Sequence, residues 1–258
     1  MTKTVLVVHA HPDRKSMTHQ LATIAKHRLA ELGHRVLETD LYAVRWKAVF
    51  DADDFLARVD PERLSFVGES GHAFATGTQT ADVAAEQAKL LAADAVIFQF
   101  PLWWFGFPAV LKGWVDRVFA YGFAYGYRGA GNTYRYGAGG LAGKRAMLSI
   151  TVGGPADDFG PRGINGPLEH VLFPITHGTL FFAGMDVLPT FAVYGTGEID
   201  EAGVVAAKHA LACRVAGLFT DAPIPYRRQN TSDYPDRRSL APDVAPGVTG
   251  IPAHIADH

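Results

Sequence analysis

The stretch AVIFQFPLWWFGFPAVLKGWVDRVFA, residues 95–120, decides the fold class of this chain of 258 residues. It begins with a largely apolar run, residues 95–100, which is typical of a buried parallel strand. Pro108 then opens a helical segment, at a helix position where the missing proline N–H costs nothing. A strand, a loop and a helix in this order form the repeating unit of a parallel α/β sheet.

The same alternation continues on both sides of this stretch. Apolar and β-branched runs predict further strands over residues 4–8, 35–39, 145–151 and 187–194. Helical spacing of apolar residues predicts helices over residues 18–32, 81–93, 167–183 and 200–219. We therefore expect an α/β fold, a flavodoxin-like doubly wound five-stranded parallel sheet with helices on both faces.

The chain is expected to form one domain and a tail. Residues 1–222 hold every predicted strand and helix, and two segments among them, residues 50–80 and 126–143, show no clear periodicity. Residues 223–258 carry six prolines and no apolar period. This composition predicts an extended or disordered C-terminal arm rather than a second domain.

Composition excludes several classes of protein. Apolar residues make up 48% and charged residues 19% of the chain, which is enough for a sizeable core. The formal net charge of −2 argues against a general nucleic-acid or membrane-surface binder. Cys213 is the single cysteine, so no intrachain disulfide can form. The first apolar run is too short for a signal peptide or a spanning helix, so we expect a cytoplasmic protein without membrane insertion.

Three loops should meet at one edge of the sheet, because ligands of doubly wound sheets bind beyond the carboxyl ends of the strands. The first loop, HAHPDRKSMT from His9, is neither a dinucleotide fingerprint nor a Walker A motif. Ser16, Thr18 and His11 lie there at the start of a helix. They can bind a pyrophosphate, or Ser16 or Thr18 can simply cap the helix.

The second and third loops offer apolar walls and close backbone approach. PLWWFGFP, residues 101–108, is dense in aromatic side chains, which either belong to the core or form the wall of a flat ligand such as a flavin. TVGGP, residues 151–155, contains Gly153 and Gly154, which either let a ligand approach the backbone or form an ordinary turn.

The segment QFPLWWFGFPAVLKGWVDRVFAYGFAYGY, residues 99–127, closely resembles the matching segment of the NAD(P)H:quinone oxidoreductases of the DT-diaphorase family. LSITVGGP, GINGPLEHVLFPITHGTLFFAGMDVL and HAHPDRKSMT continue the resemblance over residues 3–225. It implies that residues 1–222 are an FAD-binding catalytic domain, with FMN as the less favoured flavin. It also implies a homodimer whose active site uses both subunits. NAD(P)H and then a quinone would occupy the same slot in a ping-pong reaction.

The resemblance also implies roles for particular residues. The FAD phosphates would contact His11, Met17 and Thr18. The flavin ring would contact Leu102, Trp103, Trp104, Phe105, Thr151, Val152, Gly153 and Gly154. The partner side of the substrate slot would consist of Tyr125, Tyr127, Gly178 and Phe182. Arg214 is a weaker candidate near the adenine end.

Two departures from the family pattern stand out. Phe159 and Asn165 replace a tyrosine and a histidine that are thought to stabilise charge on the reduced flavin. Phe159 cannot donate a hydrogen bond, and Asn165 can donate one but cannot change charge. Of the three metal ligands found in one branch of the family, only His177 is present, because Phe181 and Tyr226 replace the others. One histidine is no metal site, so we expect no metal.

Three other functions remain compatible with the residues. The first is a regulatory or ancillary flavoprotein of a potassium efflux system. The second is a one-electron carrier of flavodoxin type, although such carriers are usually strongly acidic and this chain is nearly neutral. The third keeps the enzyme and changes the acceptor to a nitro or azo compound.

Overall fold

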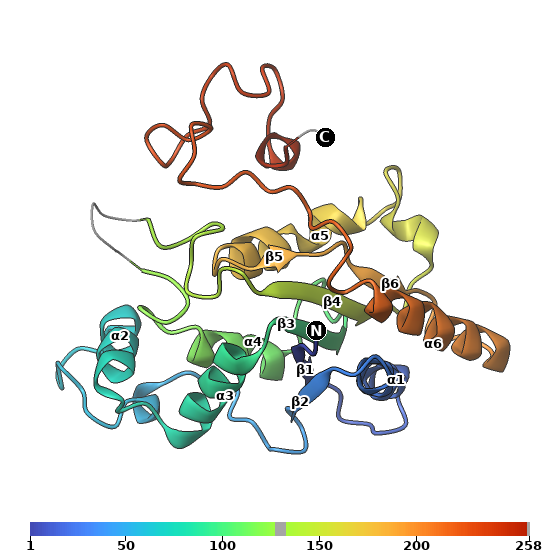
Figure 1. The fold of residues 1–258 in the computed structure, drawn as a ribbon, viewed down its shortest axis with the longest axis horizontal. Coiled ribbons are helices and arrows are strands. Elements are labelled where there is room, and N and C mark those ends of the chain that lie inside the picture. The colour runs from blue at the N-terminus through green and yellow to red at the C-terminus, as the bar shows by residue number, and fades with distance from the viewer. Residues whose placement is uncertain (127–132, 257–258) are drawn as a thin grey trace.

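A parallel β-sheet forms the centre of the computed structural model, which describes residues 1–126 and 133–256 (Figure 1). Its strands are β1 (Thr4–His9), β2 (Arg35–Asp40), β3 (Ala95–Pro101), β4 (Arg145–Thr151), β5 (Asp186–Val187) and β6 (Phe191–Val193). They are arranged in the order β2-β1-β3-β4-β5, with β6 also pairing with β4. All pairs are parallel, which confirms the predicted doubly wound α/β architecture.

Helices cover both faces of the sheet (Figure 1). They are α1 (Met17–Glu31), α2 (Phe66–Thr76), α3 (Ala81–Ala92), α4 (Ala109–Val118), α5 (Leu168–Ile175) and α6 (Glu201–Ala216). One core cluster joins α1 and α6 to the sheet, and the other joins α3, α4 and α5 to the opposite face. Short 3₁₀ helices lie at Ala52–Asp54, Ala156–Phe159 and Ile251–His254. Among the helices described here, none has the length and apolar character that a membrane span requires.

The predicted elements differ from the observed ones in three places. Helix α2 lies inside the segment for which no element was expected. The fifth strand is divided, because Pro189 between β5 and β6 has no N–H for the ladder. The helix predicted over residues 167–183 continues after Pro174 as a π-helix, Thr176–Phe181, a form that is frequent at functional sites.

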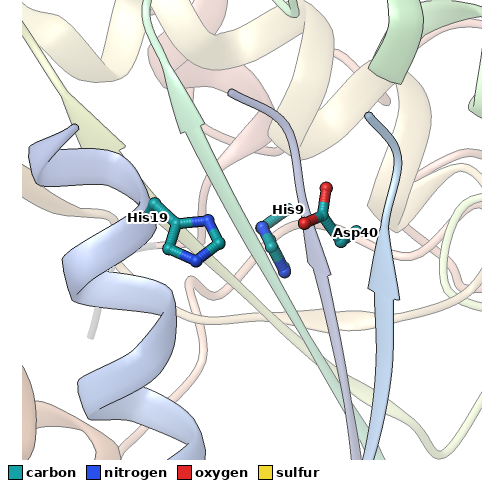
Figure 2. Close-up of side chains that lie close together, drawn as sticks. All are labelled: His9, His19 and Asp40. Atoms are coloured by element: carbon teal, nitrogen blue, oxygen red, sulfur yellow. The ribbon is translucent and has the colours of Figure 1, made fainter. Parts of the chain in front are cut away.

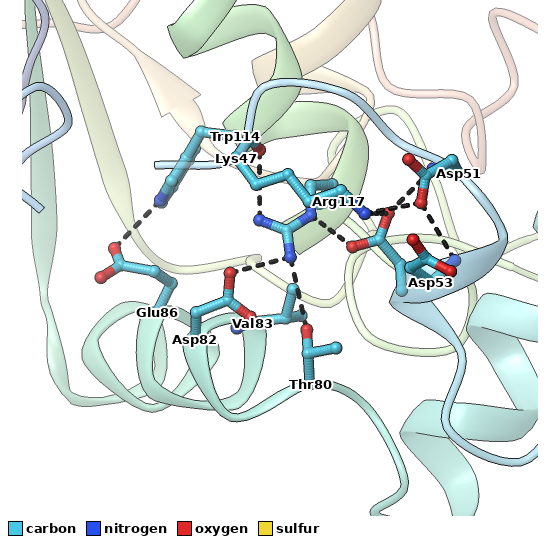
Figure 3. Close-up of polar contacts among 10 residues, drawn as sticks. Lys47, Asp51, Asp53, Thr80, Asp82, Val83, Glu86, Trp114 and Arg117 are labelled. Atoms are coloured by element: carbon cyan, nitrogen blue, oxygen red, sulfur yellow. Dashed lines mark hydrogen bonds and ion pairs between the residues drawn. The ribbon is translucent and has the colours of Figure 1, made fainter. Parts of the chain in front are cut away.

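A buried arginine joins α4 to the segments before it (Figure 3). The Arg117 Nε atom lies 2.7 Å from Asp54 Oδ1, and its Nη2 atom lies 2.8 Å from Asp82 Oδ2. The guanidinium also stacks over the Trp46 ring, 4.5 Å from the centroid. Arg117 and Asp54 are both buried, so the pair is shielded from water and holds residues 46–54 against the domain.

The C-terminal arm packs on the π-helix through aromatic rings. The His177 ring stacks on Phe173 at 4.5 Å and lies 5.0 Å from Tyr226 and 5.8 Å from His254. The Tyr226 hydroxyl, in the arm, bonds the Thr176 hydroxyl at 2.8 Å. In its described part, residues 223–256, the arm holds one 3₁₀ helix and makes specific contacts with the domain.

We expect Arg117→Met to lower the free energy of unfolding by about 3–5 kcal/mol, because it leaves the buried Asp54 carboxylate without its partner. Urea denaturation at neutral pH measures this. Lys112→Met is the matched control on the same helix, since Lys112 and Asp116 form an exposed ion pair at 2.6 Å with side chains 57% and 39% accessible. That change should cost less than about 1 kcal/mol. Equal effects of the two substitutions would contradict the buried-pair interpretation.

Burial, and then the neighbouring His254, lower the pKa of His177 from 6.5 to about 4. Between these two pH values the unfolded chain binds a proton that the folded chain does not, so stability is lost as pH falls through this window. His177→Phe keeps a flat ring on Phe173 and removes the titration. The variant should therefore lose less stability than the parent between pH 7 and pH 4.5 in urea denaturation. Parallel pH profiles would show that His177 titrates normally.

Candidate functional site

The loops after β1, β3 and β4 meet at the carboxyl edge of the sheet. The His11 ring lies 5.9 Å from the Trp103 ring, which brings the first loop to the second. The Thr18 and Thr151 hydroxyls are 2.7 Å apart, and the Leu102 N–H donates to the Thr151 carbonyl at 2.8 Å. The structure therefore brings together the three loops that the sequence analysis singled out.

The first loop presents one imidazole at the start of α1. The Ser16 hydroxyl accepts a hydrogen bond from the His19 N–H at 3.2 Å, so Ser16 is the helix cap. The Thr18 hydroxyl is buried and bonds Thr151, so it positions the loop from inside. The Asp13 N–H donates to His11 Nδ1 at 3.0 Å. His11 Nδ1 also lies 3.2 Å from the Asp13 carbonyl oxygen, so the backbone of its own loop holds this side of the ring and Nε2 is the nitrogen left for a ligand. Met17 is half-buried and packs against the core on the α1 side.

The aromatic loop after β3 is strained and exposed. Trp104 and Phe105 have φ of 49° and 60°, which is unfavourable for side chains of this size. Trp104 is 96% exposed and Phe105 is 51% exposed. Their two backbone N–H groups find no acceptor within residues 1–126 and 133–256. The loop therefore presents apolar surface and unused donors together.

The glycine loop after β4 forms the opposite wall. A Cβ added to Gly153 would meet no atom within 4 Å, so open space lies above its backbone. The N–H groups of Gly153 and Gly154 have no acceptor in the described part of the chain. The Val152 N–H donates to the Val193 carbonyl at 2.8 Å, and the Gly154 carbonyl accepts from the Gly195 N–H at 2.9 Å, so neighbouring backbone holds the loop in place.

Phe159 closes the space between these two loops. Its buried ring lies 6.4 Å from the Phe105 ring and 5.8 Å from the Tyr194 ring. We use the name cradle for Trp103, Trp104, Phe105, Gly153, Gly154 and Phe159. The cradle combines apolar walls, open space and unused N–H donors, which are the groups that a flat heteroaromatic ring with acceptors on its edge requires. These residues therefore fit a flavin.

A second group of aromatic side chains follows α4. Tyr125 lies 5.3 Å from Phe182 and 5.7 Å from Tyr121, and Phe182 lies 5.0 Å from Tyr136. We call these four side chains the aromatic face. Gly178 is exposed on the adjoining π-helix, and burial raises the pKa of Tyr125. Tyr127 lies outside the described residues.

The aromatic face and the cradle are separate groups in one chain, because no ring contact between described residues joins them. Tyr121 and Tyr136 also belong to the face, although neither was predicted as a site residue. The repeated tyrosines over residues 121–136 are the sequence signal that could have identified them.

Asn165 and Arg214 are two further predicted site residues that belong to neither the cradle nor the aromatic face. The Asn165 side chain is half-buried, and its backbone N–H donates to the Asp158 carbonyl at 2.9 Å, which places it beside Phe159. Arg214 pairs with Asp221 and donates to the Pro189 carbonyl at 2.9 Å. The Arg145 guanidinium, at the start of β4, donates to the backbone carbonyl of the same Asp221. Arg214 therefore lies at the amino edge of the sheet, which corrects its suggested place near the cofactor.

One cluster of possible metal ligands was also missed (Figure 2). His9, His19 and Asp40 have ligand atoms within 4.8 Å of one another. His9 Nε2 bonds Glu38 at 2.8 Å, burial lowers the His9 pKa, and His9 Nδ1 has no partner among the described residues. The pairing of His9 with Asp40 in the β1–β2 register would have revealed the cluster. The Lys26 ammonium pairs with Glu38 beside it and opposes a dication, so we assign no metal there.

Comparison with known proteins agrees with this architecture. A family model described as a flavodoxin-like fold matches residues 3–215. The ribosyldihydronicotinamide dehydrogenase-like protein traD of Penicillium crustosum is 44% identical over 89% of this chain and 86% of its own length. NAD(P)H dehydrogenase (quinone) 1 of Rattus norvegicus is 36% identical over 85% of this chain and 78% of its own.

A solved structure extends the match to nearly the whole chain. The crystal structure of a candidate quinone reductase from Klebsiella pneumoniae has a TM-score of 0.95 and 48% identity, and the match covers 99% of this chain and 100% of that one. The chain therefore belongs to the NAD(P)H:quinone oxidoreductase family of flavodoxin-like proteins.

Proposed function

We propose that this protein is an FAD-dependent NAD(P)H:quinone oxidoreductase with its flavin ring in the cradle. The observation that carries the proposal is the open space above Gly153, bordered by unused backbone N–H groups and exposed aromatic side chains. FAD is expected rather than FMN because the family resemblance implies it. A bound flavin would accept a hydride from NAD(P)H and deliver two electrons to a quinone. We also propose that the protein is cytoplasmic, where NAD(P)H is available.

The residues of the chain bind and orient the reactants. The His11 imidazole, at the start of α1, would donate to a phosphate together with the free N–H groups of the first helical turn. The N–H groups of Gly153 and Gly154 would donate to the flavin edge where negative charge develops on reduction. Trp103 and Phe105 would cover one side and exclude water, as a hydride transfer requires. Asn165 would add one donor near this edge without changing charge.

A second copy of the chain would complete the slot. Trp104 and Ile164 are 96% and 89% exposed around the cradle, which is unusual for large apolar side chains. Among residues 1–126 and 133–256, no ring contact joins the aromatic face to the cradle of its own chain. We therefore propose a homodimer in which Tyr125, Tyr127, Gly178 and Phe182 of one subunit face the cradle of the other. NAD(P)H and the quinone would then occupy the same slot in turn, in a ping-pong order.

One set of measurements tests the proposal directly. The purified protein should be yellow and dimeric by size-exclusion chromatography with light scattering. Heat should release FAD, identified by chromatography against FAD and FMN standards. The holoenzyme should reduce menadione with NADH or NADPH in parallel initial-velocity lines. A colourless monomer that takes up no added flavin would refute the proposal.

We expect Gly153→Val to lower flavin affinity about tenfold, because the added side chain would enter the space assigned to the ring and overpacking costs about 1–3 kcal/mol. The ratio of flavin absorbance to protein absorbance after dialysis measures the loss. Ala30→Val is the control, since Ala30 is exposed near the far end of α1. Full flavin content in Gly153→Val would place the flavin elsewhere.

We expect Tyr125→Ala to slow menadione reduction roughly tenfold while flavin content stays unchanged, because the side chain would act only on the substrate in the partner's slot. Tyr125→Phe keeps the ring and its contact with Phe182 and removes only the hydroxyl. Comparing the two variants therefore separates the effect of the ring from the effect of the hydroxyl. Steady-state kinetics at fixed NADH measure both variants. If turnover with Tyr125→Ala equals that of the parent, Tyr125 does not line the slot.

A further inference from the structure

A carboxylate lies beside the glycine wall of the cradle. A Cβ added to Gly154 would lie 3.3 Å from Asp158 Oδ2 and 3.7 Å from the Phe159 ring. The acidic group and the aromatic ring of two consecutive residues therefore approach the same glycine. Asp158 is half-buried there, whereas the preceding residue, Asp157, is exposed. The wall that offers unused N–H groups to a ligand thus also holds a negative charge at close range.

Backbone contacts fix the position of Asp158. It lies in the 3₁₀ helix Ala156–Phe159, where its N–H donates to the Pro155 carbonyl at 3.3 Å. Its own carbonyl accepts the Asn165 N–H at 2.9 Å. A Cβ on Gly163 would lie 2.4 Å from the Asp158 carbonyl, so glycine is the residue that lets the returning loop pack this closely. The loop therefore holds the carboxylate in place through its backbone.

The charge of Asp158 has no counter-charge within the chain. Its carboxylate forms no hydrogen bond or ion pair with the side chains or backbone of residues 1–126 and 133–256. Its neighbours in the cradle cannot compensate, because Phe159 has no polar atom and Asn165 cannot become a cation. A half-buried charge is screened less by salt and water than an exposed one. Asp158 is therefore placed to act on the charge of a ring in the cradle.

This position matters for a flavin because reduction changes the charge of the ring. A hydride brings two electrons and one proton, so the ring gains a negative charge unless one more proton comes from water. The Asp158 carboxylate repels that negative charge in a site from which water is excluded. The Gly153 and Gly154 N–H groups would attract it, and Asp158 limits how much of it they can stabilise. The oxidised ring is neutral, so the carboxylate affects its binding far less.

We propose that Asp158 tunes the bound flavin by disfavouring the anionic reduced ring, so that reduction by NAD(P)H takes up one proton from water. This inference rests on the proposed function, because it concerns the same ring in the same cradle. The balance is NAD(P)H, oxidised flavin and one proton giving NAD(P)⁺ and the neutral reduced flavin. The hydride and that proton then pass together to the quinone, which becomes the quinol. The slot needs no separate proton donor, which agrees with phenylalanine and asparagine at positions 159 and 165.

The first test measures the two-electron reduction potential of the flavin-loaded protein against a reference dye without oxygen. Asp158→Asn keeps the shape of the side chain and removes its charge. The reduced ring should then bind about tenfold more tightly relative to the oxidised ring, a rise of about 30 mV for a two-electron couple. Asp157→Asn is the matched control, because Asp157 lies in the same 3₁₀ helix and has no atom within 4 Å of the Cβ position at Gly154. This control should leave the potential unchanged.

Proton uptake supplies a readout that does not depend on turnover. An indicator dye in weakly buffered solution at neutral pH reports the protons consumed when NADH reduces the bound flavin. The parent should consume about one proton per flavin, and Asp158→Asn should consume fewer. Urea denaturation of Asp158→Asn should match that of the parent, because the carboxylate has no partner among the described residues. A change in potential with unchanged stability separates an effect on charge from a structural effect.

The outcomes distinguish this inference from the proposed function. An unchanged or lower potential in Asp158→Asn, an equal shift in Asp157→Asn, or equal proton uptake by parent and variant would each overturn the inference alone. A parent that takes up no flavin refutes both. If the parent binds flavin but reduces menadione with neither nicotinamide, the proposed function fails, while the potentials still decide the role of Asp158.

Discussion

The hydrogen bond between the hydroxyls of Thr18 and Thr151 connects the first turn of α1 to the end of β4, 133 positions later. It crosses above β3, because β3 lies between β1 and β4 in the sheet. Both side chains are buried, so water does not compete for the bond. The Thr151 carbonyl also accepts the Leu102 N–H at 2.8 Å, so this one residue is bonded to α1 and to the loop after β3. The two bonds fix where the loops after β1 and β3 lie relative to the loop after β4.

Backbone strain in the aromatic loop after β3 also indicates that this edge of the sheet is shaped for a ligand or a partner. Two consecutive residues, Trp104 and Phe105, adopt positive φ, each at a cost of about 1–3 kcal/mol. Folding gains little in return, since both side chains remain largely exposed. Strain that persists without compensating burial is typical of sites shaped for a ligand or a partner. The cradle and the proposed dimer contact both include this loop, so the same strained backbone positions the side chains of both.

The sequence predicted the sheet because its strands are short apolar runs, and parallel strands buried on both faces need such runs. It predicted the converging loops because the strand order of doubly wound sheets brings them to one edge. Helix α2 was missed because Gly68 and Gly71 interrupt its pattern. Arg117 pairs with residues 35 and 63 positions before it, and the His9 cluster joins residues 10 to 31 positions apart, so only the tertiary structure shows these groups. Arg214 was misplaced because similarity along a helix does not reveal which edge of the sheet a side chain reaches.

Polar atoms without partners gather directly beneath the cradle. His9, Gln99 and Ser149 occupy matched positions on β1, β3 and β4. Each has at least one buried side-chain atom with no hydrogen-bond partner among the described residues. They lie one pleat below the loops, on the face that α1 covers, because residues two apart on a strand share a face. Leucine or valine there would pack without this penalty, as Val7, Ile97 and Met147 do one pleat further down. Buried polar atoms without hydrogen-bond partners therefore lie next to the candidate site. Such a cost to stability is expected where the sequence is shaped for ligand binding as well as for folding.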